Sequence, residues 1–149
     1  MLIQDMSKET SVDFLKGARL GRIACAQGAQ PYVTPFSFAH DGGSLYSLAH
    51  IGKRIEWMRA NPLVCVEVDD IVTRREWRTV VIFCRYQELP DTPEFAEARV
   101  LAHDLLSATP SWWEPSFAKN RHDEAAPDGE PIYFRVSIEE MSGRQAIAG

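Results

Sequence analysis

Two adjacent cations follow a glycine at the expected start of a helix, as Gly52, Lys53 and Arg54. A helix N-terminus carries backbone N–H groups without intrahelical partners and a partial positive charge, so it favours anions. Lys53 adds a point charge, and Arg54 adds a guanidinium fork that can hold two oxygens of one phosphate. The same residues could instead form an exposed basic turn that keeps the helix soluble. The elements around this turn must therefore decide between a phosphate site and a solvated turn.

Few other side chains combine a reactive type with a spacing that supports chemistry. The acidic pairs Asp69-Asp70 and Glu139-Glu140 could act together as carboxylates, but a solvated turn and a strand edge explain them better. The cysteines form no Cys-x-x-Cys pair and are expected to be buried, and the histidines share no spacing for a metal site. We therefore predict no catalytic side chain and no metal site. The residues concerned are Cys25, Cys65, Cys84, His40, His50, His103 and His122.

Composition limits the class of protein. At 149 residues the chain is long enough for a substantial core, and we expect residues 1–149 to form a single domain. The net charge of −5 argues against a general nucleic-acid binder but leaves room for a local cationic pocket. No apolar run approaches the ~20 residues that cross a bilayer, and the first residues lack the pattern of a signal peptide. We expect a cytoplasmic protein that binds neither nucleic acid nor membrane.

Helices are expected at three places. The first spans residues 7–19 with Ser11 as its cap, the second follows Arg54 and ends before Pro62, and the third spans residues 91–107 with Thr92 as its cap. Residues 109–130 are expected to form an ordered excursion. Its tryptophans, Trp112 and Trp113, suit a lid, a dimer contact or core packing.

The remaining apolar segments alternate with turn residues and predict strands. Asp41 to Ser44 is a strong hairpin turn because its glycines tolerate positive φ. Consecutive hairpins, a short helix between strands and a late return strand favour a mainly β protein, a β-barrel with helical caps, in which closure removes exposed sheet edges. The expected strands span residues 21–26, 31–39, 45–49, 63–68, 77–86 and 131–138.

Six short motifs in a fixed order carry a resemblance to a known superfamily. They are Pro35–Phe38, Leu45-Tyr46, Gly52–Arg54, Asn61-Pro62, Trp77–Val81 and Phe134-Arg-Val followed by Ser142-Gly-Arg144. Over about residues 17–144 the chain resembles the FMN-binding split-barrel superfamily. Within it, the chain is similar to the pyridoxamine 5′-phosphate oxidase-like branch that includes nitroimidazole-resistance-type proteins.

The resemblance implies FMN as the cofactor and assigns residues to it. Lys53 and Arg54 match the basic pair that grips the FMN phosphate, and Thr79 matches a polar position that hydrogen-bonds the flavin ring. The family builds the flavin site at a homodimer interface, so a second subunit is expected to complete it. The strand residues expected to line the flavin are Thr34, Pro35, Phe36, Ser37, Ser47 and Leu48.

Three departures from the family pattern bear on chemistry. Leu48 stands where the branch often has histidine, and His50, on the same strand parity, is the residue that could substitute. Cys84 replaces a usual glycine. The substrate-binding arginine and histidine of authentic pyridoxamine phosphate oxidases have no counterparts, so vitamin B6 activity is not predicted.

The function expected from the resemblance is an FMN-dependent oxidoreductase that acts on a small electron-poor or conjugated substrate. A direct hydride route to or from the flavin needs no protein nucleophile. The alternatives are a flavin-binding carrier or sensor without turnover, and a split barrel that binds the deazaflavin F420 or haem.

Overall fold

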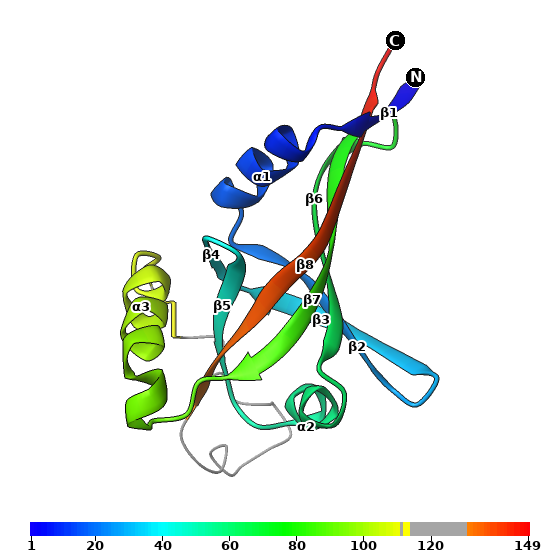
Figure 1. Cartoon of the computed structure of the whole chain (residues 1–149). Helices are drawn as coiled ribbons and strands as arrows, with labels where there is room; N and C mark the ends of the chain where they lie inside the picture. Colours follow the sequence, from blue (N-terminus) through cyan, green and yellow to red (C-terminus); the bar gives the residue numbers. More distant parts are fainter. Residues whose placement is uncertain (111, 114–130) are drawn as a thin grey trace.

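One eight-stranded antiparallel sheet organises the chain, with strand order β3-β2-β6-β7-β8-β5-β4 and β1 paired to β8. A computed structural model describes residues 1–110, 112–113 and 131–149 (Figure 1). The helices are α1 (Lys8–Gly17), α2 (Lys53–Ala60) and α3 (Ala96–Leu106), with a 3₁₀ turn, η1 (Pro93–Phe95), before α3. The strands are β1 (Leu2–Met6), β2 (Leu20–Gln27), β3 (Gln30–Ser37), β4 (Ala39–Asp41), β5 (Ser44–Ala49), β6 (Leu63–Thr73), β7 (Glu76–Glu88) and β8 (Ile132–Ile147).

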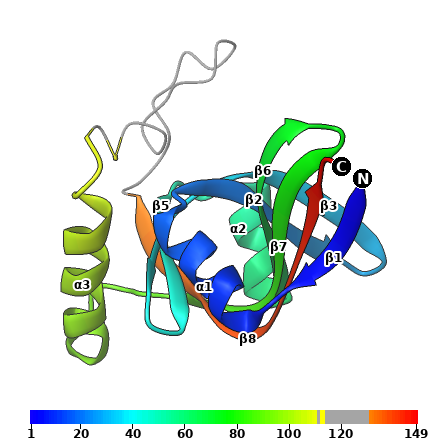
Figure 2. The same cartoon turned by 90° about the horizontal axis from the view of Figure 1, so that it is seen from above.

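The sheet curls into a barrel whose two edges are joined by the chain itself. β3 and β4 stand at opposite ends of the strand order, yet only Phe38 separates them in sequence. α1 and α2 lie at opposite ends of the barrel (Figures 1 and 2). The expected mainly β barrel with helical caps is confirmed.

The barrel interior is filled by the inward-facing half of each strand. Along β6 the buried Val64, Val66 and Val68 alternate with more exposed residues, which is the period of two that a strand with one covered face requires. At the α2 end, the Phe134 ring lies 5.9 Å from that of Phe36 and 5.3 Å from that of Tyr86, measured between centroids. These rings form the floor beneath the start of α2.

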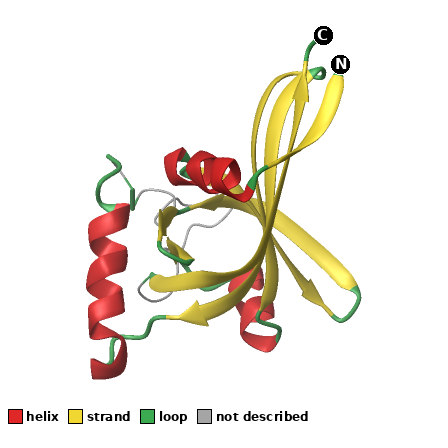
Figure 3. Cartoon of the chain, turned by 45° about the horizontal axis from the view of Figure 1, so that its top comes forward, coloured by secondary structure: helices red, strands yellow, loops and turns green. Residues whose placement is uncertain are grey.

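The sheet extends further than the sequence predicted. β6 continues to Thr73 and β8 to Ile147, and β1 was not expected at all. Beyond the barrel these segments form a projecting arm (Figure 3), in which both faces are largely exposed. The arm lacks the alternation of apolar and polar residues that marks a half-buried strand, so its backbone ladders cannot be recognised from side-chain pattern.

One of the two predicted helix caps was wrong. Ser7 caps α1 by accepting a hydrogen bond from the Thr10 N–H at 3.1 Å, whereas Ser11 is buried and donates to the Ser7 carbonyl. Thr92 is the N-cap residue of η1, with Pro93 in the first turn as predicted, although its side chain makes no capping hydrogen bond. Serine can also bond back to a carbonyl four residues earlier, and α1 places Ser11 against the core.

α3 packs on the outer face of the barrel rather than at an end. Tyr46 and Leu89 form a small buried cluster with Ala102 of α3, while Val100 faces away and is 61% exposed. Most of the expected excursion at 109–130 lies outside the described residues. No helix within the described parts of the chain is both long and apolar enough to span a membrane.

Candidate functional site

The start of α2 has no side-chain cap. Gly52 is the N-cap residue and contributes no side-chain cap, while its carbonyl accepts the first helical bond from the Glu56 N–H at 3.0 Å. α2 therefore begins without a side-chain partner from its cap, and the partial positive charge of its first turn faces outward. Asn61 and Pro62 end the helix, as predicted.

Arg54 is held in place by β3. Its Nη1 donates to the Pro35 carbonyl at 3.0 Å and to Thr34 Oγ1 at 3.3 Å, and its guanidinium carbon lies 6.0 Å from the centre of the Phe134 ring. Burial lowers the pKa of Arg54, and an arginine guanidinium nevertheless keeps its charge at neutral pH. The structure thus presents a half-buried, oriented cation with donors left over for a ligand.

Lys53 has different surroundings from its neighbour. It is exposed, and its Nζ lies 5.1 Å from the centre of the Tyr32 ring and 5.5 Å from that of Trp57. The two rings meet edge to face with their centres 5.5 Å apart. Cation–π contact of this kind keeps an ammonium near an aromatic surface without neutralising it.

Two other predicted residues of β3 and β5, Ser47 and Phe36, are buried. Ser47 is buried and donates to the Ser37 carbonyl at 2.7 Å, which ties β5 to the end of β3. Phe36 is 1% exposed and belongs to the core, so it supports the site from beneath. His50 directly follows β5 and is half-buried.

Thr79 lies on the outer face of the sheet, away from α2. It donates to Glu67 Oε2 at 3.2 Å, and Arg22 contacts both Glu67 at 3.2 Å and Asp69 at 2.7 Å. Burial, with the adjacent Asp69 carboxyl, raises the pKa of Glu67. Arg22 pairs in register with Pro35, so this polar network reaches the strand that holds Arg54.

Leu48 lies beside a polar aromatic cluster that the sequence did not reveal. It pairs in register with Tyr133, whose hydroxyl lies 3.0 Å from His103 Nδ1. The ring of Trp112 stacks on Tyr133 with centres 6.4 Å apart. The guanidinium of Arg99 lies 5.0 Å from the centre of the Tyr133 ring, so α3 covers this residue of β8.

The structure shows direct contacts for only part of the predicted set. Arg54 contacts Thr34 and Pro35 directly beside Lys53, whereas Leu48 pairs with Tyr133, the neighbour of Phe134, and Thr79 contacts Glu67 on the outer face. Tyr32 and Trp57 were not predicted, although Tyr32 precedes Thr34 by two strand residues and Trp57 follows Lys53 by one helical turn. These two periodicities are the signals that could have found them.

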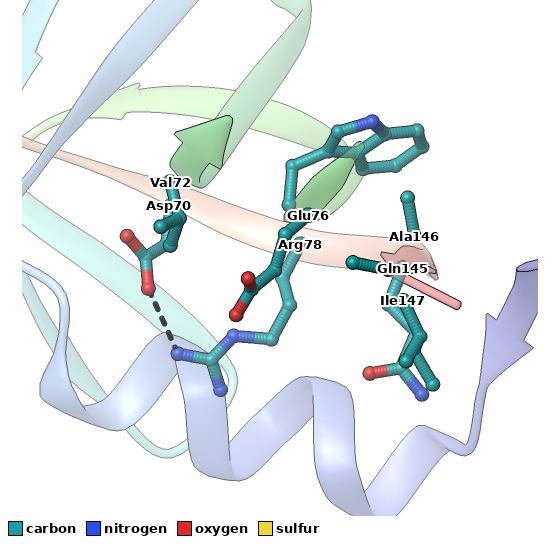
Figure 4. Close-up of a pocket in the computed structure, with 9 residues that line it drawn as sticks. Asp70, Val72, Glu76, Arg78, Gln145, Ala146 and Ile147 are labelled. Atoms are coloured by element: carbon teal, nitrogen blue, oxygen red, sulfur yellow. Dashed lines mark hydrogen bonds and ion pairs between the residues drawn. The ribbon is translucent and has the colours of Figure 1, made fainter. Parts of the chain in front are cut away.

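A groove of about 380 Å³ lies at the other end of the molecule, on the arm (Figure 4). Arg78 reaches across it to Asp70 at 3.1 Å and places its guanidinium 4.6 Å from the Phe14 ring of α1. These contacts fasten the arm to α1 and provide no cofactor chemistry. Among the described residues, no group of three or more His, Cys, Asp or Glu residues could hold a metal.

The fold and the basic helix start define a class. An antiparallel barrel whose edge strands β3 and β4 are linked through Phe38, with Lys53 and Arg54 at the start of a helix at one end, has the form of a split barrel. Residues 7–145 match the family described as pyridoxamine 5′-phosphate oxidase. The chain belongs to this family.

Relatives agree with that assignment. An uncharacterized protein of Rhizobium meliloti (strain 1021) is 38% identical over 149 residues, which cover 100% of this chain and 99% of the relative. A crystal structure described as a FAD-binding protein from Mesorhizobium loti is 40% identical, with a TM-score of 0.81, and the match covers 99% of this chain and 100% of the other.

A third similarity concerns the fold alone. A structure from Bacteroides thetaiotaomicron, provisionally described as a 5-nitroimidazole antibiotic resistance protein, is 15% identical with a TM-score of 0.67. The match covers 97% of this chain and 89% of the other. The predicted split barrel of the pyridoxamine 5′-phosphate oxidase type is thus confirmed.

Proposed function

We propose that the protein binds a flavin nucleotide whose FMN phosphate lies on Lys53 and Arg54. The observation that carries the proposal is the orientation of Arg54, fixed by Thr34 and Pro35 at the uncapped start of α2. An oriented guanidinium beside free helix N–H groups suits a phosphate because both charge and donor geometry are set before the ligand arrives. The FAD-binding description of the Mesorhizobium loti structure supports a flavin here.

We further propose that the flavin serves an oxidoreductase acting on a small electron-poor or conjugated substrate. The bound flavin would supply the redox chemistry itself. The chain would neutralise the phosphate with Lys53 and Arg54 and line the ring with the neighbouring part of β3. Leu48 can pack against a ring but cannot exchange protons, which favours chemistry at the flavin over acid–base work at that position.

The first experiment is a visible absorption spectrum of the purified protein, followed by titration of the flavin-free form with FMN. We expect a flavin spectrum or saturable binding. Absence of both would overturn the flavin proposal and bring F420 or haem forward as the ligand. Steady-state oxidation of NADH or NADPH with a panel of electron acceptors then separates an enzyme from a flavin carrier or sensor, because only an enzyme turns over.

We also propose that a second copy of the chain completes the flavin site, as the family resemblance implies. Four residues paired in register across adjacent strands lie on the outer face of the sheet. They are Val33 of β3, Ala24 of β2, Cys65 of β6 and Phe83 of β7. Val33 is 60% and Phe83 53% exposed. Large exposed apolar side chains gathered on one face are typical of a protein–protein contact. Pro35 lies on the same face, so a copy seated there would adjoin the residues that hold Arg54.

The dimer proposal is tested by the mass in solution. Light scattering after size exclusion is expected to give two chains for the native protein and one for Phe83→Asp, since a carboxylate cannot be buried unpaired in an apolar contact. Val100→Asp is the matched control, because Val100 is 61% exposed on α3, and it should remain dimeric. A native protein of single-chain mass would contradict the proposal.

A further inference from the structure

We propose that Tyr32, Trp57 and Lys53 form a second subsite that binds the adenine and second phosphate of a flavin dinucleotide, so that the protein prefers FAD to FMN. This inference rests on the proposed flavin function and assigns to it residues that no family motif covered. It rests on two observations. Lys53 and Arg54 have different surroundings at the start of α2, and the aromatic rings of Tyr32 and Trp57 lie beside Lys53.

The two cations serve neighbouring but separate positions. Arg54 faces Thr34 and Pro35, whereas Lys53 faces Tyr32. Tyr32 and Thr34 lie two residues apart on one face of β3, a separation of roughly 6–7 Å along a strand. Arg54 binds the FMN phosphate with its fork, and Lys53, which borders that phosphate, is displaced from it along β3 toward Tyr32. The offset position of Lys53 suits a second phosphate attached to the first.

The aromatic pair offers a surface for a base. Tyr32 and Trp57 are both half-buried, so each is anchored on the core while keeping an accessible part. Their edge-to-face arrangement, with centres 5.5 Å apart, fixes both planes. Aromatic side chains next to a cation are a recurrent platform for nucleobases, because every base has a π-face that can stack. Adenine attached to the second phosphate would reach this surface.

The order of residues along β3 matches the order of groups in FAD. The positions expected to line the flavin ring run from Thr34 to Ser37, the phosphate ligand Arg54 contacts Thr34 and Pro35, and Tyr32 lies on the opposite side of that contact. On the N-terminal side of Tyr32, β3 begins at the exposed hairpin that joins it to β2. The dinucleotide would therefore extend along β3 from ring to phosphates to adenine, with its adenine end near solvent.

The test compares FAD with FMN on the flavin-free protein by calorimetry or by quenching of flavin fluorescence. Native protein is expected to bind FAD about tenfold or more tightly than FMN, within the range of one base stacked on an aromatic side chain. Trp57→Leu should bring this ratio close to one, and Trp57→Phe, which keeps a ring, should retain most of it. Trp77→Leu is the matched control, because Trp77 is half-buried on the arm, and it should keep the native ratio.

Each outcome separates this inference from the function on which it rests. If neither FMN nor FAD binds, the proposed flavin function fails. If both bind with equal affinity to the native protein, the function stands and the adenine subsite is wrong. If FAD is preferred and Trp57→Leu keeps that preference, the adenine lies elsewhere and the assignment is overturned. Equal affinity of the native protein for FAD and FMN overturns the subsite whether or not a Trp57 variant folds.

Discussion

A Lys53→Ala/Arg54→Ala protein is expected to lose flavin affinity by at least about 100-fold while keeping its fold. Hydrogen bonds to charged groups contribute about 1.5–3 kcal/mol each, and this variant removes both cations to which the proposal assigns flavin phosphate. Neither side chain fills the core: Lys53 is exposed and Arg54 half-buried. Titration of the flavin-free variant with FMN and FAD measures the loss.

The matched control for charge is Arg74→Ala/Arg75→Ala. These residues form an equally adjacent, exposed basic pair at the tip of the arm, and their removal changes the net charge by the same two units. The control should bind flavin like the native protein. Unchanged affinity in the Lys53/Arg54 variant would disprove the phosphate assignment, and a loss in both variants would indicate long-range attraction rather than a site.

Arg54→Lys refines the same experiment. Lysine keeps the charge but lacks the planar guanidinium whose Nη1 donates to both Thr34 and Pro35 and whose remaining N–H groups can meet a phosphate, so affinity should fall although the charge is unchanged. Native affinity in Arg54→Lys would show that charge alone, without orientation, explains binding.

The proposed phosphate site could be predicted from sequence because its residues are local. Gly52, Lys53 and Arg54 are consecutive, and the turn that carries them is bounded by a strand before and by Asn61 and Pro62 after. Helix start, charge and helix end can all be inferred within a dozen residues. What could not be inferred is that Arg54 would be anchored to Thr34 and Pro35, since that contact depends on how β3 meets α2 across the barrel.

Residues whose sequence periodicity fits both the core and a binding site were harder to assign to either. Tyr32 and Trp57 suit a strand and a helix facing the interior, and both do touch the core, so sequence alone does not distinguish them from packing residues. Thr79 illustrates the opposite problem. Its type suits a ring-binding role, but its partner here is Glu67, twelve residues earlier on the neighbouring strand, a contact that only register reveals.

Phe134→Ala is expected to destabilise the protein by about 3–5 kcal/mol, the usual range for removing a fully buried aromatic ring. Phe134 is 0% exposed and touches two other rings, those of Phe36 and Tyr86, so its loss leaves a cavity that rigid neighbours cannot fill. For a chain of this length such a loss lowers Tm by roughly 10 °C. Thermal and urea unfolding of the flavin-free protein measure it, and Val100→Ala, at a position 61% exposed, should change little.

The same variant connects the core to the site. The guanidinium of Arg54 lies 6.0 Å from the centre of the Phe134 ring, in addition to its hydrogen bonds with Thr34 and Pro35. Without that ring Arg54 gains freedom that flavin binding must then restrict, so affinity should fall severalfold even where the variant is fully folded. Stability lost with affinity unchanged would show that β3 alone orients Arg54. A loss of stability below about 1 kcal/mol would contradict the view that these stacked rings are the floor of the site.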